Sequence, residues 1–493
     1  MKTKAALTAF FFSVTGACLF SCGDRDSEGT ADGWPAGDAR ASDAGNVTGS
    51  SDGSSDEVTE HDAGRDSEDD TDASDGRFDA ASDDAGDDTG CIPSCAGRCA
   101  GTDGCSGVCP DTCAPPQTCG GGGIPNLCGG ADAVQGRIAA GWDHTCVLTD
   151  AGGIKCWGSN KYGQLGDGTT EDRPSPVDVA GLSRSPVFVA AGSDHTCVLD
   201  EAGGIRCWGL NSTGELGNGT KYNSALPVDV AGLSAGVTMV AVGSSRTCAL
   251  TDSGGVKCWG WNAFGQLGDG TTEDSTTPVD VYGLSTGVVA ISAGSGHTCA
   301  LTSSGGVSCW GKNNSGQLGD GTTQDRIVPV EVFGLSSDVI AIAAGVNNTC
   351  AVVASGALKC WGRNELGQLG VGNANVDGRK PVDVSGLPNG ATAATVGRNH
   401  VCALTSLQGL KCWGANDRGQ LGDGTTEDKS APADVLTMTK GVAAVAAGWG
   451  HTCASVVPGG IKCWGTNEQG QLGNGVVVDT PNPNPSDVVG FGR

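Results

Sequence analysis

The sequence predicts an all-β protein, in which a seven-bladed β-propeller follows an acidic linker and a small disulfide-rich module. First, a Cys-Trp-Gly motif recurs seven times at spacings of 51 or 52 residues, which is typical of a repeat array. Second, each repeat holds four short apolar stretches bounded by Gly, Ser, Asn or Asp. Third, 84 glycines without a Gly-X-Y period and only 3 methionines argue against collagen and against a helical bundle.

The N-terminus is typical of a secretory signal, with Lys2 and Lys4 ahead of an apolar run over residues 5–20. This run is shorter than the roughly 20 residues that cross a bilayer core. Leu19-Phe20-Ser21-Cys22 resembles a bacterial lipoprotein signal, in which the cysteine is lipidated and becomes the new N-terminus. Residues 1–22 are therefore predicted to be a lipoprotein-type signal peptide with lipid on Cys22. The alternative is simple secretion without a lipid.

Residues 23–90 are predicted to be a disordered acidic linker. They hold 22 Asp and Glu against 4 Arg, a net charge of −18 within a total of −27. Apolar side chains are too few here to offset the entropy cost of ordering. A flexible chain of these 68 residues reaches roughly 45 Å, so it would hold the folded part off a membrane. A calcium-binding acidic tail is the alternative.

Residues 91–136 form a cysteine-dense module without histidine. In an exported protein an even, dense set of cysteines indicates disulfides rather than zinc, because disulfides persist there and can staple a segment that has almost no core. Eight cysteines allow 105 pairings, so the connectivity stays open. The cysteines are Cys91, Cys95, Cys99, Cys105, Cys109, Cys113, Cys119 and Cys128.

The repeats occupy residues 137–493. In the unit from 288 to 335 the expected strands are 288–293, 298–301, 307–310 and 330–333. A leucine in each Gln-Leu-Gly or Glu-Leu-Gly segment lies in an otherwise polar connection, so we expect it to anchor that loop on the blade. Four strands in each of seven units predict a closed ring rather than a solenoid, which would need polar caps. We expect 137–140 and 487–491 to complete one blade together and close the ring.

The pattern GxxHTCALTxxGxVxCWGxNxxGQLGxGT resembles the regulator of chromosome condensation repeat, whose family fold is a seven-bladed propeller. The family's role in guanine-nucleotide exchange on chromatin is not expected here, because the chain is exported and acidic and has no insertion that could act as an exchange wedge. Gly141-Trp142-Asp143-His144-Thr145 is similar to a motif of plant light sensors but lacks their arginine, so light sensing is not expected.

Each repeat has two cysteines ten residues apart, with a Gly-rich turn between them. Folding this hairpin about Ala151 places Cys146 opposite Cys156 and Leu148 opposite Ile154, with the two cysteine Cβ atoms near the range of a disulfide. One disulfide per blade is predicted, and seven pairs of reduced thiols are the alternative. The pairs are Cys146 and Cys156, Cys197 and Cys207, Cys248 and Cys258, Cys299 and Cys309, Cys350 and Cys360, Cys402 and Cys412, and Cys453 and Cys463.

Histidine precedes the first blade cysteine in five repeats, which invites a catalytic or metal-binding interpretation. Arg246 and Asn348 occupy the same place in two other repeats, so a turn or an inter-blade hydrogen bond is favoured. The aspartates of the Gly-Asp-Gly-Thr turns, such as Asp167, lack the ligand spacing of a calcium loop and are expected to serve the turns. We find no motif of a hydrolase, metalloprotease or nucleotide-binding loop, and we expect no catalytic residue, metal or cofactor.

Positions that vary between repeats are free to recognise a ligand. Trp142 and Trp449 occupy the same place in the first and seventh repeats, so ring closure should bring them together on one face. Side chains that fill local pockets are the alternative interpretation. The candidate binding residues are Trp142, Trp449, Trp261, Tyr162, Phe264 and Arg363.

These observations predict a non-catalytic, monomeric propeller at the bacterial cell envelope, or secreted, that binds a protein or a glycan. Adhesion, scaffolding and inhibition of an extracellular enzyme all fit such a module. Its contact with a membrane would be through the lipid anchor only. No nucleic-acid partner is expected, because the charge of −9 left for residues 137–493 supplies no positive field. The alternative is an extracellular hydrolase or lyase that acts on polysaccharide.

Overall fold

The computed structural model describes residues 138–387 and 390–491, together with four short strands ahead of them. Those strands are β1 (Gly101–Thr102), β2 (Val108–Cys109), β3 (Gln117–Cys119) and β4 (Cys128–Gly130), which pair as β1 with β2 and β3 with β4. The signal peptide, Cys22, the linker and the disulfides of the cysteine-rich module lie outside the described residues, so these predictions stay predictions. Among the described residues no helix is long and apolar enough to cross a bilayer.

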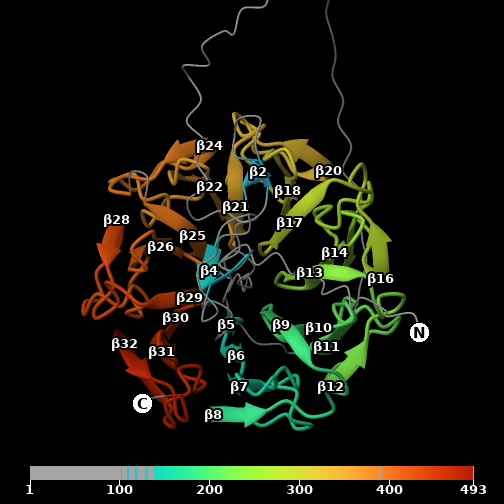
Figure 1. Ribbon diagram of the computed structural model, residues 1–493, viewed down its shortest axis with the longest axis horizontal. Coiled ribbons are helices and arrows are strands. Elements are labelled where there is room, and N and C mark those ends of the chain that lie inside the picture. Colours follow the sequence, from blue (N-terminus) through green and yellow to red (C-terminus); the bar gives the residue numbers. More distant parts are fainter. Residues whose placement is uncertain are drawn as a thin grey trace, which may run out of the picture. The chain divides into compact units, whose positions relative to one another are not determined.

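Residues 138–491 form a propeller of seven four-stranded antiparallel sheets around a central axis (Figure 1). The first blade contains β5 (Ile138–Ala140), β6 (His144–Leu148), β7 (Ile154–Gly158) and β8 (Arg173–Asp178). The second contains β9 (Pro186–Ala191), β10 (His195–Asp200), β11 (Ile205–Gly209) and β12 (Ser224–Asp229). The third contains β13 (Val237–Val242), β14 (Arg246–Thr251), β15 (Val256–Gly260) and β16 (Ser275–Asp280).

The other four blades repeat this order. The fourth contains β17 (Val288–Ala293), β18 (His297–Thr302), β19 (Val307–Gly311) and β20 (Arg326–Glu331). The fifth contains β21 (Val339–Ala344), β22 (Asn348–Val353), β23 (Leu358–Gly362) and β24 (Gly378–Asp383). The sixth contains β25 (Ala391–Val396), β26 (His400–Thr405), β27 (Leu410–Gly414) and β28 (Lys429–Asp434). The seventh contains β29 (Val442–Ala447), β30 (His451–Val456), β31 (Gly460–Asn467) and β32 (Val478–Asp487).

The first three strands expected in the fourth repeat are confirmed, and the fourth lies earlier, at Arg326–Glu331. The expectation of a blade shared by the two ends of the repeat region is wrong. β5 is the innermost strand of the first blade, which β6, β7 and β8 complete, and residues 488–491 form no strand. Ile138–Ala140 directly precedes the Gly-x-x-His turn, which is the place of an innermost strand in every other repeat.

The seven blade tryptophans and the predicted loop anchors form the core between the blades. Every blade tryptophan is fully buried, and Leu165 and its counterparts are at most 2% exposed, so the loop-anchor prediction is confirmed. The innermost strands are almost wholly buried, whereas the outermost strands are partly exposed. Each outermost strand contains a proline, such as Pro329, which lowers the risk that the exposed sheet edge pairs with another chain.

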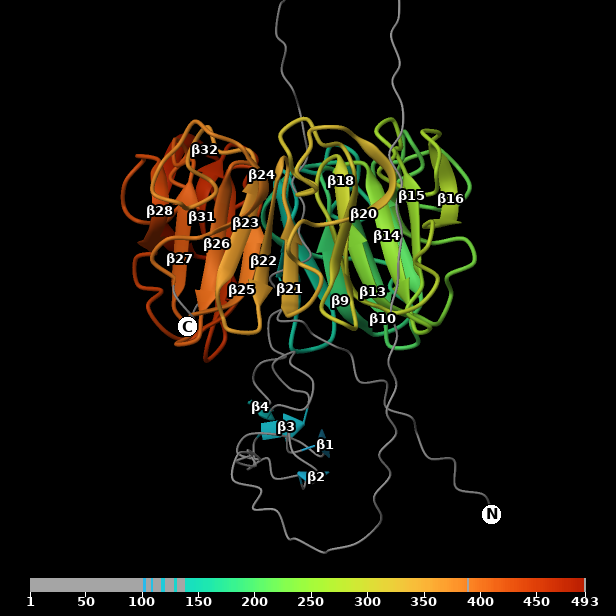
Figure 2. The same cartoon turned by 90° about the horizontal axis from the view of Figure 1, so that it is seen from above.

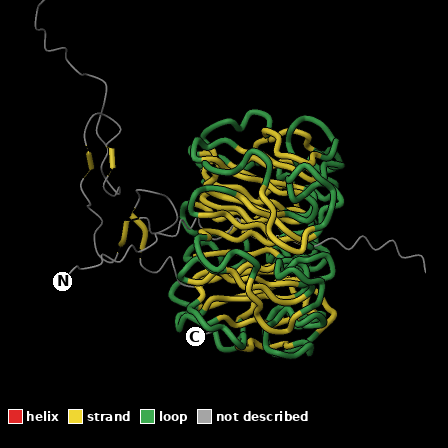
Figure 3. Tube along the Cα trace, turned by 90° about the vertical axis from the view of Figure 1, so that its right-hand side faces the viewer, coloured by secondary structure: helices red, strands yellow, loops and turns green. Residues whose placement is uncertain are grey.

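The propeller has two faces that are chemically different. Strands cross its thickness, as the edge-on view in Figure 2 and the side view in Figure 3 show. At one face lie the turns between first and second strands, such as 141–143, and the long loops between third and fourth strands; we call it the Trp142 face. At the other lie the turns between second and third strands and the connections between blades; we call it the Ile138 face, because β5 begins there.

Glycine permits the close approach of neighbouring blades at the ring seam. Gly473 has φ +64°, and a Cβ atom there would lie 2.7 Å from Nε1 of Trp157. The glycine of each Gln-Leu-Gly or Glu-Leu-Gly segment is therefore required for two reasons. Its backbone is left-handed, and a side chain there would collide with the indole ring of the next blade.

Candidate binding face

The disulfide prediction agrees with the geometry of every blade. Cys146 pairs with Cys156 across β6 and β7, and Leu148 stands opposite Ile154, as the hairpin argument required. The same bond joins the two cysteines in each of the other six blades. All fourteen blade cysteines are fully buried, so these bonds cross-link the strands of each blade and offer no accessible redox site.

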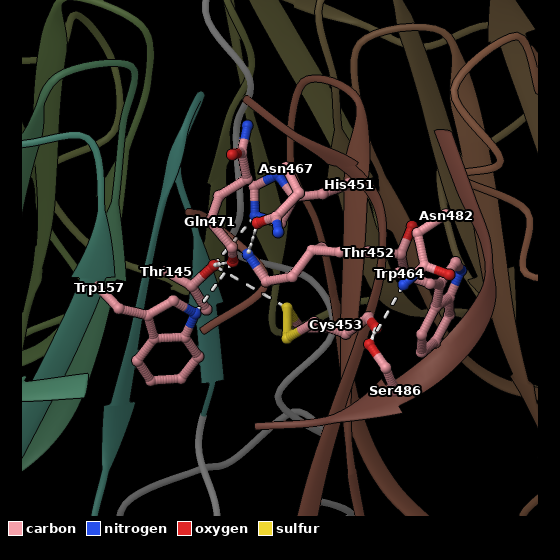
Figure 4. The surroundings of a disulfide bond; sticks show 12 residues. Thr145, Trp157, His451, Thr452, Cys453, Trp464, Asn467, Gln471, Asn482 and Ser486 are labelled. Atoms are coloured by element: carbon pink, nitrogen blue, oxygen red, sulfur yellow. Dashed lines mark hydrogen bonds between the residues drawn. A yellow bond between two sulfur atoms is a disulfide. The ribbon is translucent and has the colours of Figure 1, made fainter. Parts of the chain in front are cut away.

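A repeated hydrogen-bond clasp joins each blade to the next. At the seam the hydroxyl of Thr145 and the indole N–H of Trp157 both donate to the main-chain oxygen of Gln471, at 3.1 and 2.9 Å (Figure 4). His451 Nε2 lies 3.0 Å from the same threonine oxygen. Because the threonine proton is directed to Gln471, the histidine must donate from Nε2. Four other boundaries between blades have the same hydrogen bonds. Between the first and second blades, for example, they join His144, Thr196, Trp208 and the main-chain oxygen of Gln164.

Burial keeps these histidines neutral. It lowers the pKa of His144, His195, His297 and His451 to about 3 and that of His400 to about 4. Among the described residues the Nδ1 atoms of His195, His297, His400 and His451 have no hydrogen-bond partner. For His144 the backbone of Ser193 opposes part of the lowering of the pKa by burial. A proton added at Nδ1 would therefore place an unpaired charge in the interior. The histidines serve the inter-blade contacts, as their repetition indicated, and are not placed for acid–base catalysis.

Two blades vary the clasp. Arg246 replaces histidine in the third blade, and its Nε still donates to Thr298 at 2.9 Å while Nη1 donates to the carbonyl of Ser295 at 2.6 Å. In the fifth blade Asn348 takes the place of the histidine, and in the sixth Val401, which has no hydroxyl, takes the place of the threonine. The Nδ2 of Asn348 has no partner within the described part of the chain. Among the described residues, this boundary between blades five and six thus lacks the bond between two side chains that the other six have, although the Trp413 indole still donates to the main-chain oxygen of Gln368 at 3.0 Å.

The aspartates of the Gly-Asp-Gly-Thr turns are engaged by their own loop. Asp167 accepts hydrogen bonds from Asn160, from the amide and hydroxyl of Thr169, and from Arg173. Burial alone would raise the pKa of the Asp167 carboxyl. These hydrogen bonds outweigh burial and hold this pKa below its ordinary value. Within residues 138–387 and 390–491, no group of three His, Cys, Asp or Glu side chains is placed to hold a metal ion.

Two anchors of this loop were not predicted. The asparagine of each Trp-Gly-x-Asn segment is fully buried, and Asn160 accepts from the amide of Leu165 while it donates to the loop on its other side. The second anchor is the main-chain oxygen of Gln471 and its counterparts. The repeated asparagine was visible in the sequence, but a main-chain acceptor leaves no side-chain signal.

All six candidate binding residues lie at the Trp142 face, in its turns and long loops. Trp142 and Trp449 meet across the seam as predicted, edge to face, with ring centroids 6.2 Å apart. Trp142 is only 4% exposed and packs with Val346 of the fifth blade, so most of its ring is not open to a ligand. Trp449 is partly buried, and the Arg398 guanidinium lies 4.5 Å from its ring centroid.

The other four candidates are separate from this pair. Trp261 and Phe264 form a second aromatic pair in the third blade, edge to face at 5.2 Å, and both are partly exposed. Lys312 of the fourth blade lies 5.2 Å from the Phe264 ring centroid. Tyr162 and Arg363 lie elsewhere on the face, and Arg363 forms an ion pair with Glu365.

The comparisons with known proteins agree with this fold. The RCC1-like domain family matches residues 234–492, and the regulator of chromosome condensation (RCC1) repeat matches 137–164, 152–199, 187–215 and 203–250. The ultraviolet-B receptor UVR8 of Arabidopsis thaliana is 35% identical over 349 residues, which cover 69% of this chain and 79% of the receptor. The secretion-regulating guanine nucleotide exchange factor of Bos taurus is 31% identical over 369 residues, covering 69% and 79%.

Two solved structures extend the comparison. Prp20p from Saccharomyces cerevisiae, whose structure was described with its binding to Gsp1p and histones, superposes with a TM-score of 0.62 at 26% identity, covering 68% of this chain and 85% of Prp20p. Human WBSCR16 superposes with a TM-score of 0.57 at 26% identity, covering 64% and 85%.

Proposed function

Because the chain belongs to the regulator of chromosome condensation repeat family, we propose that its propeller is a non-catalytic module that binds a protein through the Trp142 face. One observation carries the proposal. The repeated polar side chains are engaged within and between blades, whereas the six candidate binding residues, which differ between repeats, lie in the turns and long loops of this face. The binding of Prp20p to Gsp1p and histones is a precedent for protein recognition by this fold.

A protein fits the aromatic groups better than a glycan does. Sugars stack on a broad ring face that is open to solvent. Trp142 is buried, and Trp449 is flanked by Trp142 and by the guanidinium of Arg398. The partly exposed Trp261 and Phe264 with nearby Lys312 present an apolar patch beside a cation, which is a common composition of protein interfaces.

The alternative of a polysaccharide hydrolase or lyase has one supporting observation. A hollow of about 480 Å³ at the Trp142 face is lined by Asp143, Asp172 and Asp194 together with Lys161. Paired carboxylates are the usual catalytic groups of glycoside hydrolases. Here Asp143 accepts a hydrogen bond from Gln471 and Asp172 accepts one from the amide of Asn160, so both carboxylates also hold loops in place.

We place this module at the bacterial cell envelope as part of the same proposal. Lipid on Cys22 and the acidic segment 23–90 would hold the propeller away from the membrane that carries it. Metabolic labelling with a radioactive fatty acid tests this step. The full chain should incorporate label, and Cys22→Ser should not.

The experiment for the function compares variants of the full chain. Wild type, the double variant Trp261→Ala with Phe264→Ala, and Leu407→Ala are immobilised and exposed to native envelope extract. Leu407 is 81% exposed in a turn of the Ile138 face, so its variant is the matched control. A protein retained by wild type and Leu407→Ala but lost by the double variant supports the proposal. Identical retention by all three contradicts it, and turnover of a polysaccharide by the purified chain favours the alternative.

A further inference from the structure

We propose a second binding site: an apolar pocket between the seventh and first blades, at the Ile138 face, which takes a leucine-type side chain together with its adjacent amide. The pocket has a volume of about 60 Å³. Val147 and Leu148 line it from the first blade, and Ser455, Ile461 and Phe491 line it from the seventh. We call it the seam pocket.

A single replacement in the repeat creates much of this space. Ser455 takes the place of the residue two positions after the first blade cysteine, which is aliphatic in the other six blades. The counterparts are Leu148, Leu199, Leu250, Leu301, Val352 and Leu404. Leu199 and Leu301, for example, are at most 2% exposed and fill the core of their blades. In the seventh blade the isobutyl group is missing, and the seam pocket lies beside the place that it would fill.

The seam pocket also contains a polar group that lacks a partner. The Ser455 side chain is 4% exposed, and its Oγ has no hydrogen-bond partner among the described residues. A buried hydroxyl without a partner costs on the order of 1–3 kcal/mol. An amide N–H or carbonyl of a ligand would satisfy it. Asp150, at the rim of the pocket, is the one charged residue among those lining it.

These features define the ligand's chemistry. Apolar walls and one convergent polar group are the usual composition of a small-ligand pocket. The equivalent space in the other blades takes Leu or Val, so the apolar part should be branched and of that size. Both a free amino-acid derivative and a residue within a peptide present this group. Because the pocket lies on the face opposite the proposed protein-binding surface, its occupation does not depend on that proposal.

Saturation-transfer NMR on the full chain tests the site with N-acetyl-L-leucinamide as the probe. We expect transfer to its methyl groups with wild type, and loss of the signal with Ser455→Leu, which fills the pocket with the residue of the other blades. Ser304→Leu is the matched control, because it adds the same group to an exposed turn of the fourth blade, and it should retain the signal. The shorter probe N-acetyl-L-alaninamide should give at least a fivefold weaker signal.

Ser455→Ala keeps the pocket and removes the hydroxyl. It should weaken binding of the leucine probe about fivefold, and it keeps the proposal testable if Ser455→Leu does not fold. A peptide with Leu between glycines distinguishes the sources: tighter binding than the free derivative indicates a protein residue, and equal binding indicates a free small molecule. No transfer to the probe with wild type, or undiminished transfer with folded Ser455→Leu, would overturn the proposal.

Discussion

His451 Nε2 lies 3.0 Å from Thr145 Oγ1 and so joins the seventh blade to the first across 306 residues of sequence. The same pair of side chains connects neighbouring blades elsewhere, so the ring seam is held by the contacts that hold the rest of the propeller. A closed ring is thereby obtained without any strand shared between the two ends of the repeat region.

Removal of either partner of this pair should destabilise the propeller. Thr145→Val leaves the buried donor of His451 unpaired, and a loss of about 1–3 kcal/mol in the free energy of unfolding is expected. His451→Asn with Thr145→Val reproduces the natural combination of Asn348 and Val401. The double variant should lose less than the sum of the two single losses, measured by denaturant unfolding. Strict additivity of the two losses would contradict the coupling.

Gly473→Ala should weaken the ring seam more than an alanine elsewhere at the same backbone conformation. A Cβ atom at Gly473 meets the indole of Trp157, whereas one at Gly181, with φ +74°, has no atom within 4 Å. Both variants bear the cost of a left-handed backbone, about 1 kcal/mol, and only Gly473→Ala also displaces a buried ring. A lower melting temperature for Gly473→Ala than for Gly181→Ala is expected. Equal melting temperatures would contradict the close approach.

Stability should fall on mild acidification. The five blade histidines have folded pKa values of about 3 or 4 against an ordinary value of 6.5, so the unfolded chain binds more protons between these limits. Their contribution is complete above about pH 6.5 and is lost as the pH falls toward 4, at up to about 1.4 kcal/mol per pH unit for each histidine. Denaturant unfolding at pH 7.5, 6 and 5 measures this. A flat profile over that range would show that the histidines are not buried as neutral groups.

Each blade disulfide should contribute measurably to stability. Cys299 and Cys309 close a short loop, for which about 2–3 kcal/mol is expected from the reduced entropy of the unfolded chain. The double variant Cys299→Ser with Cys309→Ser should lose at least this amount in unfolding experiments, because it also buries two hydroxyl groups. As an independent check, none of the fourteen blade cysteines should react with a thiol reagent in unfolded, unreduced protein. Fourteen reactive thiols would show that the blade cysteines are reduced and would contradict the prediction.

The repeat made most of the fold predictable from the sequence. A fixed period showed which residues are equivalent in each repeat. The pairing of Cys146 with Cys156 then followed from folding one hairpin, and the contact of Trp142 with Trp449 followed from closing the ring. The expectation of a shared blade was an error in assigning equivalent positions: Ile138–Ala140 directly precedes the Gly-x-x-His turn, which is the place of the first strand of a repeat and not of its second.

The burial of Trp142 could not be predicted from the repeat. Trp142 is buried because Val346, more than two hundred residues later and in a blade that is not adjacent, packs against it. Equivalence between repeats says nothing about contacts between positions that are not equivalent. For the same reason the seam pocket, which Leu148 of the first blade and Ser455 of the seventh line together, was not predicted.

The closed ring is tested most directly by hydrogen exchange at the indole of Trp157, whose N–H donates to Gln471 of the seventh blade at 2.9 Å. NMR of the full chain, with the signal assigned by Trp157→Phe, compares its exchange rate with that of Trp208, which makes the same bond to Gln164 within the chain's interior. We predict that the two indole protons exchange equally slowly. Rapid exchange at Trp157 beside slow exchange at Trp208 would show an open array and contradict the account.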